Sequence, residues 1–234
     1  MASVNTNYGA MVALQQLNQT NSALETTQSR INTGLKVASA KDNGAIYAIA
    51  QGMRSDVAGY GVVKESLDRS SSTVDVAVAA GEAVSDLLID MKEKALGAAD
   101  ASLTAAQRSA FNEDFTALRD QIATIVSNAE FNGVNLINNS TTGVNALASA
   151  DGTSTITVAD EAIGLSGSIV TLTSTAQLDT VTNASAAVGT IETSLNNLNQ
   201  ALARLGTASK ALGVHSDFVT KLSDVTEKGI GNLV

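Results

Sequence analysis

Few side chains in this sequence could carry out catalysis or hold a metal ion. The chain has one histidine, His215, and no cysteine. Disulfides and thiolate metal sites are therefore excluded, and a histidine-based zinc site would lack its second imidazole. No H-E-x-x-H segment is present, which excludes the zinc-protease motif. We interpret His215, which lies on a helical segment flanked by Ser and Gly, as structural, and we predict no enzymatic activity, no cofactor and no metal.

Two glycines, Gly59 and Gly61, are the remaining candidates for a chemical motif, because glycine-rich turns can surround a phosphate. They lie inside a long heptad pattern, and no Lys-Ser or Lys-Thr pair follows them as a phosphate loop requires. Close packing of helices explains these glycines better than phosphate binding does.

The composition favours long helices in an acidic protein. The 234 residues include no proline and no tryptophan, and the formal net charge is −9. Proline interrupts helices, so its absence suits long uninterrupted ones. No basic residue lies between Arg119 and Arg204, which argues against nucleic acid or an anionic membrane as a partner. With neither a signal peptide nor a long apolar run, we expect a soluble protein whose export would use another route.

Three segments carry apolar residues at heptad spacing and are predicted to form one elongated antiparallel bundle. They span residues 43–97, 104–128 and 180–225, and Thr104 with Gln107 predicts a capping box at the start of the second. Before the first, Gly34 is expected to end a helix and Ser39 to cap the next one, with Asp42 in its first turn. The predicted buried ladders are Ile46, Met53, Tyr60, Leu67, Val74, Leu88 and Ala95, then Phe111, Phe115, Leu118, Ile122, Ile125 and Val126, then Ile191, Leu198, Leu205, Leu212 and Val219.

The middle of the chain changes period. Residues 138–152 resemble a loop, whereas Ile156–Val158 and Ile169–Thr173 are rich in β-formers and are predicted to pair as a small hairpin. The fold class is therefore mainly α: an elongated antiparallel helical bundle or coiled-coil rod with a small β-hairpin region.

The segment of residues 5–33 has a heptad pattern of its own but no matching segment in the chain. Isolated helices of this length depend on packing of their apolar face. We therefore interpret this face as a surface for packing against another molecule or another segment. Its apolar positions are Ala10, Leu14, Leu17, Leu24, Ile31 and Leu35, which we predict to be the polymerisation interface.

The stretch from Arg30 to Ser55, RINTGLKVASAKDNGAIYAIAQGMRS, resembles the N-terminal signature of bacterial flagellins. The resemblance extends to residues 130–134, EFNGV, and to residues 229–234, GIGNLV. It implies a structural subunit that polymerises into the extracellular flagellar filament for swimming motility. It also implies a helical rod in which the chain ends build the filament core and the middle faces solvent.

The same resemblance implies partners and boundaries. Partners would be other copies of the chain, the flagellar export machinery with its flagellin chaperone, and the hook-associated and cap proteins. Members of the family continue for about forty residues beyond the point that matches Val234, so we expect a C-terminal helix to be missing here. The implied parts are a filament-core helix and connection at 1–42, rod helices at 43–130, an outer hairpin region at 131–176 and a rod helix at 177–234. Asp90 and Lys94 differ from the residues that recognition by the vertebrate flagellin receptor would require.

Three alternatives remain open at this point. A hook–filament junction protein shares the rod, but normally has weaker versions of the signature. A flagellin with an inserted protease would require the absent zinc motif and a larger middle segment. A helical signalling or export-chaperone protein would leave the Arg30–Ser55 match unexplained, and would form defined oligomers rather than filaments.

Overall fold

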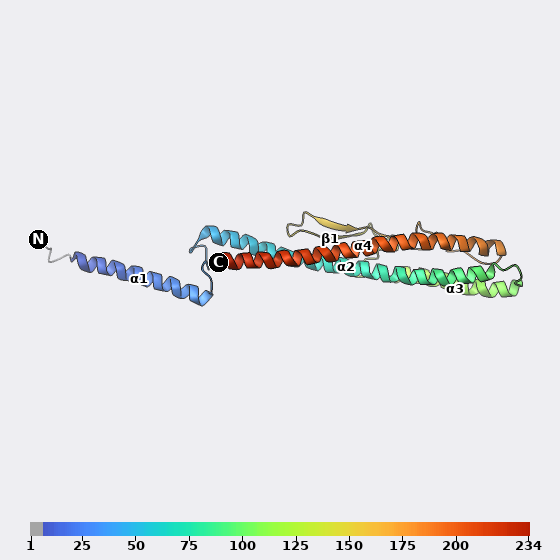
Figure 1. Ribbon diagram of the computed structural model, residues 1–234, viewed down its shortest axis with the longest axis horizontal. Helices are drawn as coiled ribbons and strands as arrows, with labels where there is room; N and C mark the ends of the chain where they lie inside the picture. The colour runs from blue at the N-terminus through green and yellow to red at the C-terminus, as the bar shows by residue number, and fades with distance from the viewer. Residues whose placement is uncertain (1–6) are drawn as a thin grey trace. The chain divides into compact units, whose positions relative to one another are not determined.

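The computed structural model describes residues 7–234, and this part of the chain is mainly helical with one small antiparallel sheet (Figure 1). It divides into two compact units, Met1–Ala58 with Leu222–Val234 (unit 1) and Gly59–Lys221 (unit 2). The predicted mainly α class with a small β element is confirmed. The elements are α1 (Tyr8–Thr33), α2 (Gly44–Ala98), α3 (Ala105–Asn128), β1 (Val144–Leu147), β2 (Thr155–Val158) and α4 (Val181–Leu233).

Within unit 2, α2 and α4 run antiparallel to each other, as Figure 1 shows. The Lys92 ammonium lies 2.8 Å from the Glu192 carboxylate, and the Ser209 hydroxyl donates to Asp75 at 3.2 Å. Residue numbers therefore rise along α2 as they fall along α4. This is the antiparallel pairing that the heptad segments predicted.

The core of unit 2 follows most of the predicted ladders, although Tyr60, Phe111, Leu118 and Ile125 are only partly buried against it. Leu67 is 1% exposed, and the apolar residues seven apart on α4 are buried with it. Gly81 occupies a gap in the α2 ladder, because a Cβ atom there would lie 2.7 Å from the Leu202 side chain. The buried ladder residues are Leu67, Val74, Leu88 and Ala95 on α2, Phe115, Ile122 and Val126 on α3, and Ile191, Leu198, Leu205, Leu212 and Val219 on α4.

Helix α3 begins with the predicted capping box. The Thr104 hydroxyl accepts from the Gln107 backbone N–H, and the Gln107 side chain accepts from the Thr104 N–H at 2.9 Å. At the preceding turn, the Arg108 guanidinium donates to the Ala98 carbonyl at 2.9 Å. Together these bonds satisfy polar backbone groups at both helix ends where α2 turns into α3.

The predicted hairpin has one correct strand and one wrong one. β2 covers the predicted Ile156–Val158 segment, but its partner is β1, from the part that we expected to be a loop. The strands are antiparallel, with Val144 opposite Val158 and Leu147 opposite Thr155. The Leu147 N–H also donates to the Ser66 hydroxyl on α2 at 3.1 Å.

Residues 169–173 are irregular because the packing of apolar side chains and bonds to other groups replace a strand ladder. Ile169, Val170 and Leu172 are all buried in the unit 2 core. The Thr171 N–H donates to the Ser194 hydroxyl on α4 at 3.0 Å. The Leu172 carbonyl accepts from the Ser166 N–H at 2.8 Å. A β-branched run can thus be buried without pairing as a strand.

The connection between α1 and α2 corrects the predicted cap. Gly34 does end α1 in the left-handed conformation, with φ 71°. Ser39, however, precedes the helix, and the side chain of Asn43 accepts from the Ile46 N–H at 3.1 Å as the cap of α2. Asp42 instead closes a local turn by accepting from the Ser39 N–H at 2.9 Å. This bond and that of the Ser39 hydroxyl lower the pKa of the Asp42 carboxyl.

Unit 1 has a small core of its own at the C-terminal end of α4. The Val234 carbonyl accepts from the Lys36 N–H and, at 3.2 Å, from the Val37 N–H. Val37, Ala50 and Val234 are buried together. The connection after α1 is therefore anchored to the ends of two helices. The partly buried members of this cluster are Leu35, Ile46, Tyr47, Ile230 and Leu233.

None of the helices in residues 7–234 is long and apolar enough to cross a membrane.

Candidate assembly surface

Helix α1 is well formed at both ends, although it is composed largely of modest helix formers. Its N-cap is Asn7, whose side chain accepts from the Ala10 N–H at 3.2 Å. At the other end, the Gly34 N–H donates to the Arg30 carbonyl at 2.8 Å. These caps satisfy backbone groups that would otherwise be left to water. They position the apolar face of α1, and they do not cover it.

The predicted interface positions on α1 are all exposed, and no residue of α1 is buried by the described part of the chain. Leu14 is 59% exposed, Leu17 55%, Leu24 56% and Ile31 74%. Burying a side chain of this kind stabilises by about 1.5–3 kcal/mol. The structure therefore leaves a considerable apolar surface of α1 in contact with solvent. We define the α1 face as Ala10, Leu14, Leu17, Leu24 and Ile31.

The sixth predicted residue, Leu35, lies apart from the α1 face. It follows the C-cap Gly34 and packs against the unit 1 core. The heptad spacing continues through Leu35 in the sequence, but the left-handed conformation at Gly34 turns the backbone away from the helix axis. The structure brings the other five residues together and separates this one.

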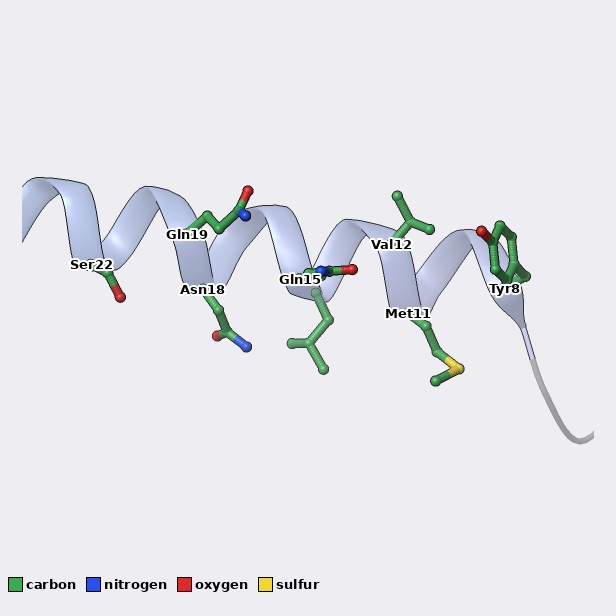
Figure 2. Close-up of a pocket in the computed structure, with 8 residues that line it drawn as sticks. Tyr8, Met11, Val12, Gln15, Asn18, Gln19 and Ser22 are labelled. Atoms are coloured by element: carbon green, nitrogen blue, oxygen red, sulfur yellow. The ribbon is translucent and has the colours of Figure 1, made fainter.

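The side chains that line one candidate pocket all come from the start of α1, as Figure 2 shows. Met11, Asn18 and Ser22 point to one side of the helix, and Val12 and Gln19 point to the other. A ligand pocket is normally concave and buries most of its ligand. Side chains that point to opposite sides of one exposed helix enclose no such ligand site.

His215 has a structural contact rather than a catalytic arrangement. Its Nε2 atom lies 2.8 Å from the Ala148 carbonyl oxygen, just after β1. Its ring centroid lies 5.9 Å from that of Phe218. Gly59 also packs here, because a Cβ atom would lie 2.7 Å from the Ala150 Cβ. The contact of His215 supports its structural interpretation. Gly59 packs against the β1–β2 loop rather than against another helix, and a Cβ atom at Gly61 would meet nothing within 4 Å, so the predicted helix packing of these two glycines is wrong.

Unit 2 also has two exposed apolar surfaces that lie outside the predicted ladders. On α2, Ile89 is 54% exposed and Leu96 is 63% exposed. On α4, Val214 is 62% exposed and Phe218 is 55% exposed. The sequence does indicate these surfaces, because each of the four residues is apolar and lies within two positions of a ladder residue without belonging to the ladder.

An ion pair joins the irregular segment that follows β2 in the sequence to α4. Both guanidinium nitrogens of Arg204 that face Glu161 donate to its carboxylate at 2.6 Å. Glu161 is buried at 9% exposure, and its backbone N–H donates to the Leu136 carbonyl at 2.9 Å. Planar bidentate pairing is the strong form of this contact. It raises the pKa of Arg204 and fixes the chain after β2 to the side of α4.

The neighbouring Asp160 is a source of pH dependence. Its Oδ1 atom is buried and has no hydrogen-bond partner within residues 7–234. Burial, and secondly the negative charge of Glu161, raise the pKa of Asp160 above 3.8. The folded protein therefore binds this proton more tightly than the unfolded chain does. The unfavourable contribution of Asp160 is fully present above the folded pKa and disappears as the pH falls below 3.8.

We expect Asp160→Asn to raise the thermal midpoint of the monomeric chain at pH 7, because it removes a poorly solvated charge. The advantage should shrink as the pH is lowered toward 3, where wild-type Asp160 is itself neutral. Circular-dichroism melts at the two pH values measure this difference. Asp68→Asn, at an exposed position on α2, provides the matched removal of one negative charge. An Asp160→Asn advantage that is the same at pH 3 and pH 7 would contradict the assignment.

Comparison with known proteins identifies the family of the chain. Residues 4–142 match the model of the bacterial flagellin N-terminal helical region. The chain is 51% identical over 232 residues to flagellin FljK of Caulobacter vibrioides, in a match that covers 99% of this chain and 84% of FljK. The chain belongs to the flagellin family. A flagellin of Brucella melitensis is 32% identical over 243 residues, covering 100% of this flagellin and 86% of the relative.

Solved structures show the same fold at much lower identity. The crystal structure of Bacillus cereus flagellin matches with a TM-score of 0.59 at 20% identity, covering 66% of this chain and 88% of that one. A protein described as flagellar hook-associated, from Vibrio parahaemolyticus, matches with a TM-score of 0.68 at 14% identity, covering 83% and 100%. The fold is thus shared by flagellins and a hook-associated protein, and only the sequence relatives distinguish this flagellin from the latter.

Proposed function

We propose that this chain polymerises into the bacterial flagellar filament through the α1 face, and that residues 1–42 belong to the filament core. The observation that supports this interface is the uncovered apolar surface of a capped, 26-residue helix. Assembly would bury Leu14, Leu17 and Leu24 between molecules, and apolar burial is the main driving force of such association. The flagellin relatives support the same function independently.

The division of the remaining chain follows from this proposal. Residues 43–130 and 177–234 form the helical rod, and residues 131–176 form its outward-facing surface. The proposed role requires no catalysis, because the work of a filament subunit is packing. The contacts of His215 with Ala148 and Phe218 support a structural role for the only imidazole.

Location and partners extend the proposal. A filament subunit leaves the cell, so we infer that this flagellin is secreted through the flagellar export machinery after binding its flagellin chaperone. At the two ends of the filament it would contact the hook-associated and cap proteins. These assignments rest on membership of the flagellin family.

A hook–filament junction protein is the second candidate, favoured by the fold match to the hook-associated protein. The identity of 51% to FljK favours the filament subunit instead, because the match to the hook-associated protein has only 14% identity.

Complementation of a bacterium that lacks its own flagellins tests the proposed function. We expect the gene of this flagellin to restore long filaments, seen by electron microscopy, and to restore swimming in soft agar. Cells with bare hooks would contradict the filament role. Labelled chain confined to a short zone next to the hook, in cells whose own flagellin is retained, would support the junction protein instead.

A further inference from the structure

Two asparagine–glycine pairs lie on the surface of this flagellin, Asn43–Gly44 at the start of α2 and Asn132–Gly133 after α3. Such a pair can lose ammonia without an enzyme, because glycine has no Cβ atom to keep its backbone nitrogen away from the asparagine side chain. All four residues are exposed, so water can reach both pairs. The structure nevertheless restrains the two pairs differently.

The pair at Asn132 is held in a closed turn. Asn132 has φ 51° and Gly133 has φ 80°, and two successive residues of this kind are typical of a type I′ turn. The turn is closed by the Phe131 N–H bond to the Val134 carbonyl and by the reverse bond, each at 3.0 Å. In such a turn the Gly133 nitrogen is rotated away from the Asn132 side chain. The turn must therefore open before this nitrogen can attack.

Fewer bonds restrain the pair at Asn43. Its Oδ1 atom accepts from the Ile46 N–H at 3.1 Å, whereas residues 7–234 provide no hydrogen-bond partner for its Nδ2 atom or for the Gly44 N–H. A Cβ atom at Gly44 would meet nothing within 4 Å, so the space around the reacting atoms is open. The Ile46 N–H also faces the oxygen on which negative charge develops when Cγ is attacked, and a donor in that place stabilises the charge.

We infer that Asn43 is a site of spontaneous deamidation in the folded flagellin, and that its turn protects Asn132. The Gly44 nitrogen gives its proton to solvent and forms a bond to Cγ of Asn43. The bond from Cγ to Nδ2 then breaks, and ammonia leaves with a proton taken from water. Water next opens the resulting succinimide ring at one of its two C–N bonds. One opening gives aspartate, and the other gives isoaspartate, whose main chain runs through Cβ and Cγ.

The two products change the connection before α2 differently. Aspartate is as good a helix cap as asparagine, so the bond from the Ile46 N–H can persist. Isoaspartate adds an atom to the main chain and moves the free carboxylate to Cα, which removes the cap. The same connection carries the Lys36 and Val37 N–H groups that bind the Val234 carbonyl. Older chains therefore accumulate an altered anchorage of unit 1. Deamidation at Asn43 needs no filament and is independent of the proposed function.

Timed incubation of the folded chain at mildly alkaline pH tests this assignment. Deamidation replaces an NH2 group by OH and adds about 1 Da, which peptide mass spectrometry detects and locates. Trypsin releases residues 42–54, and cleavage after Glu130 gives a peptide that begins at Phe131. We expect Asn43 to convert at least about tenfold faster than Asn132 in the folded chain. In urea the two should convert at similar rates, because glycine follows both.

Gly44→Ala is the matched variant. Gly44 lies outside the left-handed region and has open space around it, so alanine fits the folded helix. The added methyl group should slow conversion at Asn43 about tenfold in folded and unfolded chain alike. Conversion at Asn132 that matches or exceeds that at Asn43 in the folded chain would overturn the inference. An Asn43 that stays intact while the unfolded chain converts, or whose conversion Gly44→Ala leaves unchanged, would overturn it as well.

Discussion

Replacing Leu17 and Leu24 of α1 by aspartate should abolish filaments while leaving unit 2 folded. In the monomer both side chains are more than half exposed, so the change costs the isolated chain little. In the filament we expect them to be buried, where each lost leucine removes about 1.5–3 kcal/mol. An unpaired carboxylate in an apolar contact adds a further penalty of several kcal/mol. Electron microscopy of complemented cells and circular-dichroism melts of the monomer measure the two effects separately.

Gln19→Asp with Thr26→Asp is the control for this double variant. It adds the same two charges to exposed positions of the same helix, and Figure 2 shows Gln19 pointing away from Asn18 and Ser22. Filaments should persist in the control because the apolar face is unchanged. Normal filaments in the Leu17→Asp, Leu24→Asp variant would remove the α1 face from the assembly surface.

Replacing Leu67 by alanine should destabilise unit 2 by about 2–5 kcal/mol, through lost burial and the cavity left behind. Leu67 is 1% exposed and belongs to the main core cluster. Its neighbours lie on long helices that cannot easily collapse into the vacated space. Chemical unfolding followed by circular dichroism measures the change in the free energy of unfolding.

Ser71→Ala is the control, one helical turn away on the same face of α2. Ser71 is only half-buried, so its truncation should change stability within about 0.5 kcal/mol. Similar denaturation midpoints for the two variants would show that Leu67 is not a core residue of the folded monomer.

The helices of this protein and their buried faces could be predicted from local pattern. The ladder from Leu67 to Ala95 and the α4 ladder from Ile191 to Val219 are both buried as their spacing indicated. The Thr104–Gln107 capping box also follows from two residues three apart. A heptad spacing determines which side chains share a helix face, so a partner helix of the same kind is enough to bury them.

The N-cap of α2 could not be predicted from local sequence, because two residues are equally suited to that position. Ser39 and Asn43 are both good capping residues, and each is followed by a helix-compatible segment. Asn43 caps the helix because the Asp42 carboxylate already binds the Ser39 N–H and hydroxyl. Segments 35–37 and Val234 then anchor this turn within unit 1.

The same distinction applies to the assembly surface. Heptad spacing correctly placed five of the six predicted residues on one exposed face of α1, whereas the turn at Gly34 removes Leu35 from that face; the role of the face in assembly stays a prediction. Ile156 of β2 lines one hollow with Val214 and Phe218 of α4, and this long-range neighbourhood could not be predicted from the helix pattern.

The sequence by itself therefore determined the helical elements, their apolar ladders and the flagellin family, because these depend on residues within a few turns of one another. Only the tertiary structure decided the partner of β2 and the path of residues 169–173. The Leu147 N–H meets the Ser66 hydroxyl, 81 positions away, and the Thr171 N–H meets Ser194. Such bonds join backbone groups to side chains that no local period connects. They form only once the packed helices have brought both groups to the same place.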